Sequence, residues 1–149
     1  MIHIRSSKRS LPVASDVIDR AARATLAHQS ADGDLSIVLT EDAQLRQLNR
    51  DYLGIDAPTD VLSFPASETD PESGSAYLGD ILISVPRARQ QATEARHPLS
   101  WELQLLVVHG LLHLLGYDHA KPVEKKRMWT AQAAILESIG LAGIRIRES

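Results

Sequence analysis

Three of the six histidines in the chain lie within eleven residues, between positions 109 and 119 of a strongly apolar stretch. His109 and His113 are four residues apart, so on a helix their imidazoles would project from one face and could bind the same metal ion. Gly116 follows, and a glycine just past a helix can take the left-handed conformation that turns the chain back and returns His119 to that ion. Three neutral imidazoles leave one position of a tetrahedral zinc ion open to water, which is typical of catalytic sites. The sequence therefore predicts one Zn²⁺ per chain, bound by His109, His113 and His119.

The spacing of these residues is that of the elongated zincin motif, H-E-x-x-H-x-x-G-x-x-H, but Gly110 stands where that motif has its glutamate. Because the glutamate is the general base of zincin proteases, ordinary peptide hydrolysis is disfavoured, and any base must come from another segment or be metal-bound hydroxide. Two other interpretations of the histidines are a hydrogen-bonded core and a purely structural zinc site. The second usually needs thiolate ligands, and the chain has no cysteine.

Length and composition are those of one globular domain, 1–149, with a single core, since 44% of the 149 residues are hydrophobic. The lack of cysteine excludes disulfides and gives no reason to expect an oxidising compartment. The start of the chain lacks the apolar core of a signal peptide, and the longest apolar stretch, 103–115, is too short to span a bilayer. We expect a cytoplasmic protein with no membrane or disulfide partner.

The formal net charge is −3, so the chain lacks the overall positive charge that is typical of nucleic-acid-binding proteins. Two local groups of cations remain, and each is either an RNA contact or an ordinary solvated surface. They are Arg5, Lys8 and Arg9 near the start of the chain, and Arg87, Arg89 and Arg96 on one predicted helix.

The apolar pattern predicts an α+β (mixed α/β) domain with about four strands and helices packed over them. Strands are expected at 1–6, 35–39, 61–64 and 78–84, and helices at 12–29, from a Thr40 cap to about Gly54, 84–96, 99–115 and 122–139. The metal-binding helix, apolar nearly all round, should lie at the centre. No helix fits between strands 61–64 and 78–84, so that pair is expected to be an antiparallel hairpin in a mixed sheet. His97, before Pro98, is expected in an exposed turn, and Trp129 is interpreted as a packing residue.

Three blocks carry a resemblance to a known family: HGLLHLLGYDH at 109–119, DAPTDVLSFP at 56–65 and LGDILIS at 78–84. In order and spacing they resemble the YbeY family, bacterial metal-dependent hydrolases regarded as single-strand-specific endoribonucleases. The resemblance implies a mixed four-stranded sheet and zinc ligation by His109, His113 and His119. It also implies maturation of the 3′ end of small-subunit (16S) ribosomal RNA and ribosome quality control, with ribosomal RNA, the small subunit and its associated proteins as partners.

The chain departs from the family at one position. Many members have an arginine after the tyrosine that matches Tyr52, and that arginine is regarded as part of the active site; here Leu53 takes its place. The change removes a fixed cation that could hold a phosphate. Arg50 is near in sequence and could substitute, and Arg87 and Arg89 are further candidates for RNA contact.

The leading hypothesis is that zinc lowers the pKa of its bound water and presents hydroxide to an RNA phosphodiester. Asp118 could orient a ligand imidazole, take a proton, or simply stabilise the turn. Asp60 and Ser63 could line the cleft from the neighbouring loop and strand. The alternatives are a non-catalytic ribosome assembly factor with a zinc-stabilised fold, and a metal-dependent hydrolase of another substrate, including an unusual peptidase.

Overall fold

A computed structural model describes residues 1–8, 10–55, 59–66, 76–118, 120–142 and 144. Its sheet has the strand order β1-β2-β4-β3. These strands are β1 (Ile2–Ser6), β2 (Asp34–Thr40), β3 (Val61–Pro65) and β4 (Tyr77–Ser84). β1, β2 and β4 are parallel, whereas β3 runs antiparallel to β4. The predicted α+β fold with a mixed four-stranded sheet and a β3–β4 hairpin is therefore confirmed.

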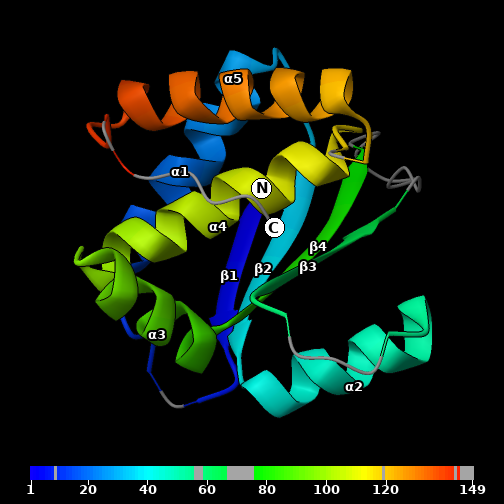
Figure 1. Cartoon of the computed structure of the whole chain (residues 1–149), viewed down its shortest axis with the longest axis vertical. Coiled ribbons are helices and arrows are strands. Elements are labelled where there is room, and N and C mark those ends of the chain that lie inside the picture. The colour runs from blue at the N-terminus through cyan, green and yellow to red at the C-terminus, as the bar shows by residue number, and fades with distance from the viewer. Residues whose placement is uncertain (9, 56–58, 67–75, 119, 143, 145–149) are drawn as a thin grey trace.

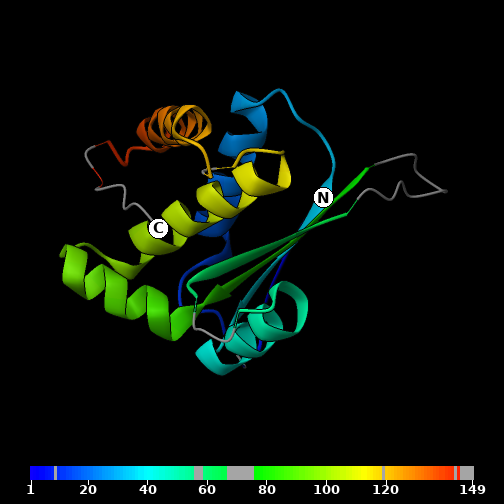
Figure 2. The same ribbon diagram turned by 45° about the vertical axis from the view of Figure 1, so that its right-hand side comes forward.

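Helices cover both faces of the sheet unequally. The helices of the described residues are α1 (Ser15–His28), α2 (Asp42–Leu53), α3 (Val85–Ala95), α4 (Leu99–Leu114) and α5 (Pro122–Ser138). Figures 1 and 2 show α1, α3, α4 and α5 on one face and α2 alone on the other. The chain thus has a large core under four helices and a small one, built on Leu45, Leu62 and Leu82, under α2.

Helix α4 lies at the centre of the large core, as its apolar pattern predicts. Leu103, Val107, Val108, Leu111 and Leu112 are fully buried between the sheet and the other helices. Such a helix has no solvated face over most of its length, so its position is fixed by packing on all sides. Only its last turns rise toward the surface, and His109 and His113 lie there, each partly buried.

Gly110 allows α4 to approach the sheet at that point. A Cβ atom on Gly110 would lie 2.9 Å from Cγ2 of Ile81 and 3.2 Å from Cγ2 of Val61 and Oγ of Ser63. These contacts come from β3 and β4, and two of the three atoms belong to β-branched side chains with little freedom to move. The position that holds the zincin glutamate therefore faces the sheet here and has no room for a side chain.

Two local expectations were wrong. Thr40 is the last residue of β2, and the N-cap of α2 is Glu41, which makes no side-chain cap hydrogen bond. His97 is not exposed: only 6% of its side chain is accessible, and its Nε2 lies 2.8 Å from Oε1 of the fully buried Glu102. Arg96 adopts a left-handed conformation (φ 58°) at the end of α3, and this turn brings His97 back over the start of α4.

We expect Gly110→Ala to lower the free energy of unfolding by about 1–3 kcal/mol, because overpacking against Ile81 and Val61 outweighs the helix propensity of alanine. Urea denaturation measures the loss. The same substitution in an Ile81→Ala background should cost less, since the closest contact is then gone. An equal cost in both backgrounds would contradict the close-approach explanation.

Candidate metal centre

His109 and His113 form the core of the site. Their Nε2 atoms lie 3.2 Å apart, and their ring centroids are 4.8 Å apart with the rings inclined at 73°. Two nitrogens bound to one tetrahedral zinc ion, each about 2.0–2.1 Å from it, are about 3.3 Å apart. The Nε2 separation is therefore compatible with both nitrogens binding one zinc ion, which stays a prediction of the i, i+4 spacing.

The turn after α4 has the geometry that the sequence predicts for Gly116. The glycine has φ +102°, its N–H donates to the carbonyl of His113 (3.1 Å), and the N–H of Tyr117 donates to the carbonyl of Leu112 (3.0 Å). These two bonds define a Schellman motif, which reverses the chain at a helix end. His119, the predicted third ligand, lies outside the described residues, so its ligation stays a prediction. Within the described residues, no group of three or more metal-binding side chains occurs.

Helix α5 fixes the orientation of His109. Nδ1 of His109 lies 3.0 Å from Oε1 of Gln132, which is 1% exposed. An amide oxygen only accepts, so His109 carries its proton on Nδ1 and keeps the Nε2 lone pair for a metal ion. Trp129 packs against the same ring at a centroid distance of 5.7 Å, which agrees with its predicted packing role. The sequence did not lead us to Gln132. Its position as a polar residue within the apolar stripe Met128, Ile135 and Leu136 could have indicated a buried hydrogen bond.

A cleft of about 440 Å³ opens at the two histidines. Asp60 and Ser63, both predicted to line it, do so together with Leu53 from α2. The Ser63 hydroxyl donates to the carbonyl of Gly110 at 2.9 Å, so it ties β3 to α4 between the two histidines. Ser63 is thereby a positioning residue. Asp60 lines the same cleft, and its charge also helps to raise the pKa of Arg87.

Comparison with known proteins identifies the family. The family model described as endoribonuclease YbeY matches residues 2–140. The chain belongs to the YbeY family. A curated endoribonuclease YbeY from Moorella thermoacetica is 42% identical over 93% of this chain and 96% of its own length, and one from Roseiflexus castenholzii is 44% identical over 87% and 86%. The solution structure of TM1509 from Thermotoga maritima has a TM-score of 0.61 at 27% identity, covering 93% of this chain and 89% of that one. The resemblance inferred from the three sequence blocks is confirmed.

The remaining candidate residues of this YbeY-family chain line other hollows. Asp118 lines one with Arg127 and Glu124 beyond the end of α4. Arg50 lies on α2, where its Nε is 3.4 Å from Oδ1 of Asp51, and it lines a hollow with Asp42 and Arg46. Neither contributes to the lining of the two-histidine cleft.

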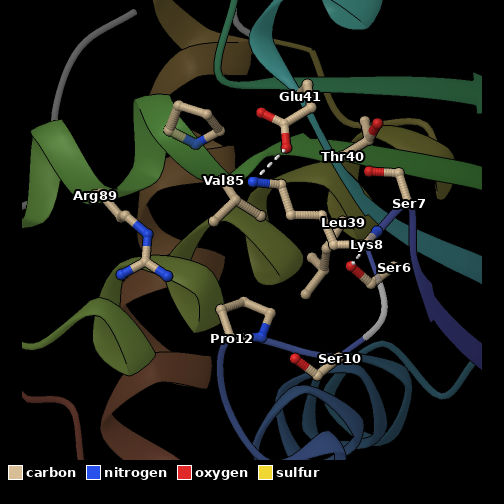
Figure 3. Close-up of a pocket in the computed structure, with 11 residues that line it drawn as sticks. Ser6, Ser7, Lys8, Ser10, Pro12, Leu39, Thr40, Glu41, Val85 and Arg89 are labelled. Atoms are coloured by element: carbon tan, nitrogen blue, oxygen red, sulfur yellow. Dashed lines mark hydrogen bonds and ion pairs between the residues drawn. The ribbon is translucent and has the colours of Figure 1, made fainter.

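Arg87 and Arg89 lie at the start of α3. Nε of Arg87 is 3.2 Å from Oδ1 of Asp42, and this hydrogen bond raises the pKa of Arg87 and lowers that of Asp42. Arg89 lies at a hollow of about 270 Å³ at the carboxyl ends of β1 and β2, where Lys8 Nζ is 3.1 Å from Oε1 of Glu41 (Figure 3). The structure therefore does not bring Arg50, Arg87 or Arg89 to the histidines, whereas Leu53 lines their cleft.

Within the described part of the chain, no helix is both long and apolar enough to cross a membrane.

We expect Gln132→Ala to weaken zinc binding about 10–100-fold, because loss of the hydrogen-bond acceptor frees the tautomer and orientation of His109. Competition titration with a fluorescent zinc chelator measures the affinity. Gln104→Ala is the matched control, since Gln104 is also buried but bonds Arg20 and the Ser100 carbonyl. Equal losses in the two variants would mean that Gln132 only supports the fold.

Proposed function

We propose that this chain is a zinc-dependent, single-strand-specific endoribonuclease that matures the 3′ end of small-subunit (16S) ribosomal RNA and takes part in ribosome quality control. Its membership of a family of endoribonucleases supports RNA hydrolysis. The observation that carries the proposal is the convergence of the His109 and His113 Nε2 atoms, 3.2 Å apart, at a cleft of the size of a small ligand site. The ribosomal role rests on the family resemblance.

His109 and His113, with His119 as the predicted third ligand, would hold the ion. Zinc is the proposed metal because it binds well to imidazole ligands. The chain has no cysteine, so no thiolate could replace a histidine as a ligand. When bound, zinc supplies a Lewis acid for a phosphoryl oxygen and lowers the pKa of a coordinated water molecule. Gln132 keeps His109 in the tautomer that this ligation requires.

Asp60 is the proposed proton acceptor. It is the carboxylate among the described residues that line the two-histidine cleft, whereas Asp118 lines a separate hollow beside Arg127. A general base must be within reach of the attacking water, so position favours Asp60. The zincin base position is closed to this role, since Gly110 faces the sheet. This arrangement also disfavours a peptidase.

The proposed partners are ribosomal RNA, the small ribosomal subunit and its associated proteins. The proposed location is the cytoplasm, where such a substrate would be found.

His113→Ala should abolish zinc uptake and RNA cleavage together, because one of the two converging nitrogens is lost. Metal content is measured by mass spectrometry, and cleavage by gel analysis of a single-stranded RNA and of its duplex, with and without chelator. His28→Ala is the control, since His28 is an exposed residue of α1. Cleavage that persists in fully demetallated protein would refute zinc dependence, and equal cleavage of the duplex would refute strand specificity.

A non-catalytic assembly factor with a zinc-stabilised fold is the second candidate. The observation in its favour is Leu53, because the described lining of the cleft contains no lysine or arginine to hold a phosphate.

Leu53→Arg separates the two candidates. If the cleft is catalytic, the new guanidinium should raise kcat/KM for RNA about tenfold or more, since a charge-assisted hydrogen bond to a phosphate is worth about 1.5–3 kcal/mol. Steady-state cleavage of the single-stranded RNA measures the effect, and Leu53→Gln controls for side-chain length. Hydrolysis that stays at background in both variants would favour the assembly factor.

A further inference from the structure

Strand β3 is an edge strand whose pairing pattern can be assigned residue by residue. It lies at the outer side of the sheet (Figure 1) and pairs with β4 from Val61↔Ile83 to Pro65↔Gly79 without a register shift. Just beyond its two ends, Ser84 N–H donates to the Asp60 carbonyl (2.9 Å) and Ala66 N–H donates to the Leu78 carbonyl (3.0 Å).

In an antiparallel pair, hydrogen-bonded and non-hydrogen-bonded positions alternate. Because residues 60 and 66 both bond toward β4, the even-numbered residues Leu62 and Phe64 do so as well. The main-chain groups of Val61, Ser63 and Pro65 therefore point away from the sheet. Pro65 fits this assignment, since a proline without an N–H is tolerated on the outer side of an edge strand.

The outward edge runs along the two-histidine cleft, whose lining includes Val61, Ser63 and Pro65. It presents the N–H groups of Val61 and Ser63 and the carbonyl of Ser63, for which the described residues provide no hydrogen-bond partner. The Val61 carbonyl receives a long bond of 3.4 Å from the Thr59 hydroxyl. Since Ser63 is tied to the carbonyl of Gly110, the edge is held at a fixed position beside the histidines.

We propose that this free edge of β3 binds the sugar–phosphate backbone of an RNA strand. The N–H groups of Val61 and Ser63 donate to phosphate oxygens, and the Ser63 carbonyl accepts from a 2′-hydroxyl. The inference rests on the proposed function and names the part of the site that would hold the substrate.

Three observations favour a ribonucleotide strand at this edge. The described lining of the cleft has no lysine or arginine, so a phosphate there must accept hydrogen bonds from other donors. Main-chain N–H groups commonly donate to phosphate oxygens in nucleic-acid complexes. A ribose–phosphate chain alternates phosphate acceptors with 2′-hydroxyl donors, which complements an edge that alternates N–H and C=O. A peptide strand is the competing occupant of any free edge, but Pro65 removes one of the N–H groups that a peptide ladder would use.

Ser63→Pro tests the proposal, because it deletes the outward N–H and leaves the bonds from β3 to β4 intact. Ser63→Ala is the matched control, since it keeps the N–H and loses only the hydroxyl bond to Gly110. The probe is a labelled single-stranded RNA with phosphorothioate linkages, shown to be intact after measurement, and zinc-loaded protein is titrated against it by fluorescence anisotropy. A DNA strand of the same sequence and an extended peptide are the comparison probes.

We expect Ser63→Pro to bind the RNA about tenfold more weakly than wild type. Ser63→Ala should lose clearly less affinity, because it keeps the outward N–H and gives up only the hydroxyl bond that positions the edge. Wild type should bind RNA several-fold more tightly than DNA, since DNA lacks the 2′-hydroxyl. Val61→Pro, with Val61→Ala as its control, is a second test of RNA affinity. It removes the N–H at the first position of the strand, where proline is well tolerated. Thermal melting identifies which variants are folded.

Folded proline variants with wild-type RNA affinity would overturn the proposal, as would an equal loss in Ser63→Ala or binding of the peptide in place of RNA. The affinity is judged apart from cleavage, so a wild type that binds RNA through this edge and cleaves none would reject the proposed function alone.

Discussion

The close approach of α4 to strands β3 and β4 at Gly110 is the constraint on which the site depends. The absence of a side chain there lets the helix rest on Ile81 and Val61, and the backbone carbonyl of Gly110 accepts the Ser63 hydroxyl at 2.9 Å. Interiors are packed closely enough that a single methyl group would shift the helix or the strands. Because His109 and His113 lie on the same helix, their positions relative to the sheet are also fixed, and so is the width of the cleft between them and β3.

The same constraint explains why the chain keeps a zincin-like spacing without the zincin base. In a helix, the residue after His109 projects about 100° from it, and here that direction leads into the sheet. A glutamate at this position would be buried among apolar side chains with no charge partner, which costs several kcal/mol. The absence of the base is therefore a consequence of how α4 packs, and an acid–base group would have to come from outside the helix, as proposed for Asp60.

Much of the fold and part of the site could be predicted because their signals are local. The apolar pattern of α4, the i, i+4 histidines and the Gly116 turn each depend on neighbours in sequence, and all three have the expected geometry. His97 and Gln132 were missed since their partners come from other elements: the buried carboxylate of Glu102 in the next helix, and the ring of His109 across the α4–α5 contact. A sequence pattern shows which face of a helix is apolar, but it does not show which polar group on that face will find a partner. The arginines show the same limit: Arg87 is held by Asp42, 45 positions away in sequence.

With Leu53 at the position where the family resemblance implies an arginine, the described lining of the cleft offers no side-chain cation to bind an anion. Side-chain cations are flexible and tolerate errors in placement, whereas main-chain N–H groups bind well only if the backbone is held still. The β3 edge meets that condition: it is paired with β4 on one side and tied to α4 through Ser63. The packing that leaves no room for the zincin glutamate also fixes the positions of the backbone N–H donors in such a site. The rigid contact between α4 and β3 thus leaves no room for a glutamate at position 110. It also holds still the main-chain N–H groups of β3 that would bind a phosphate in place of an arginine.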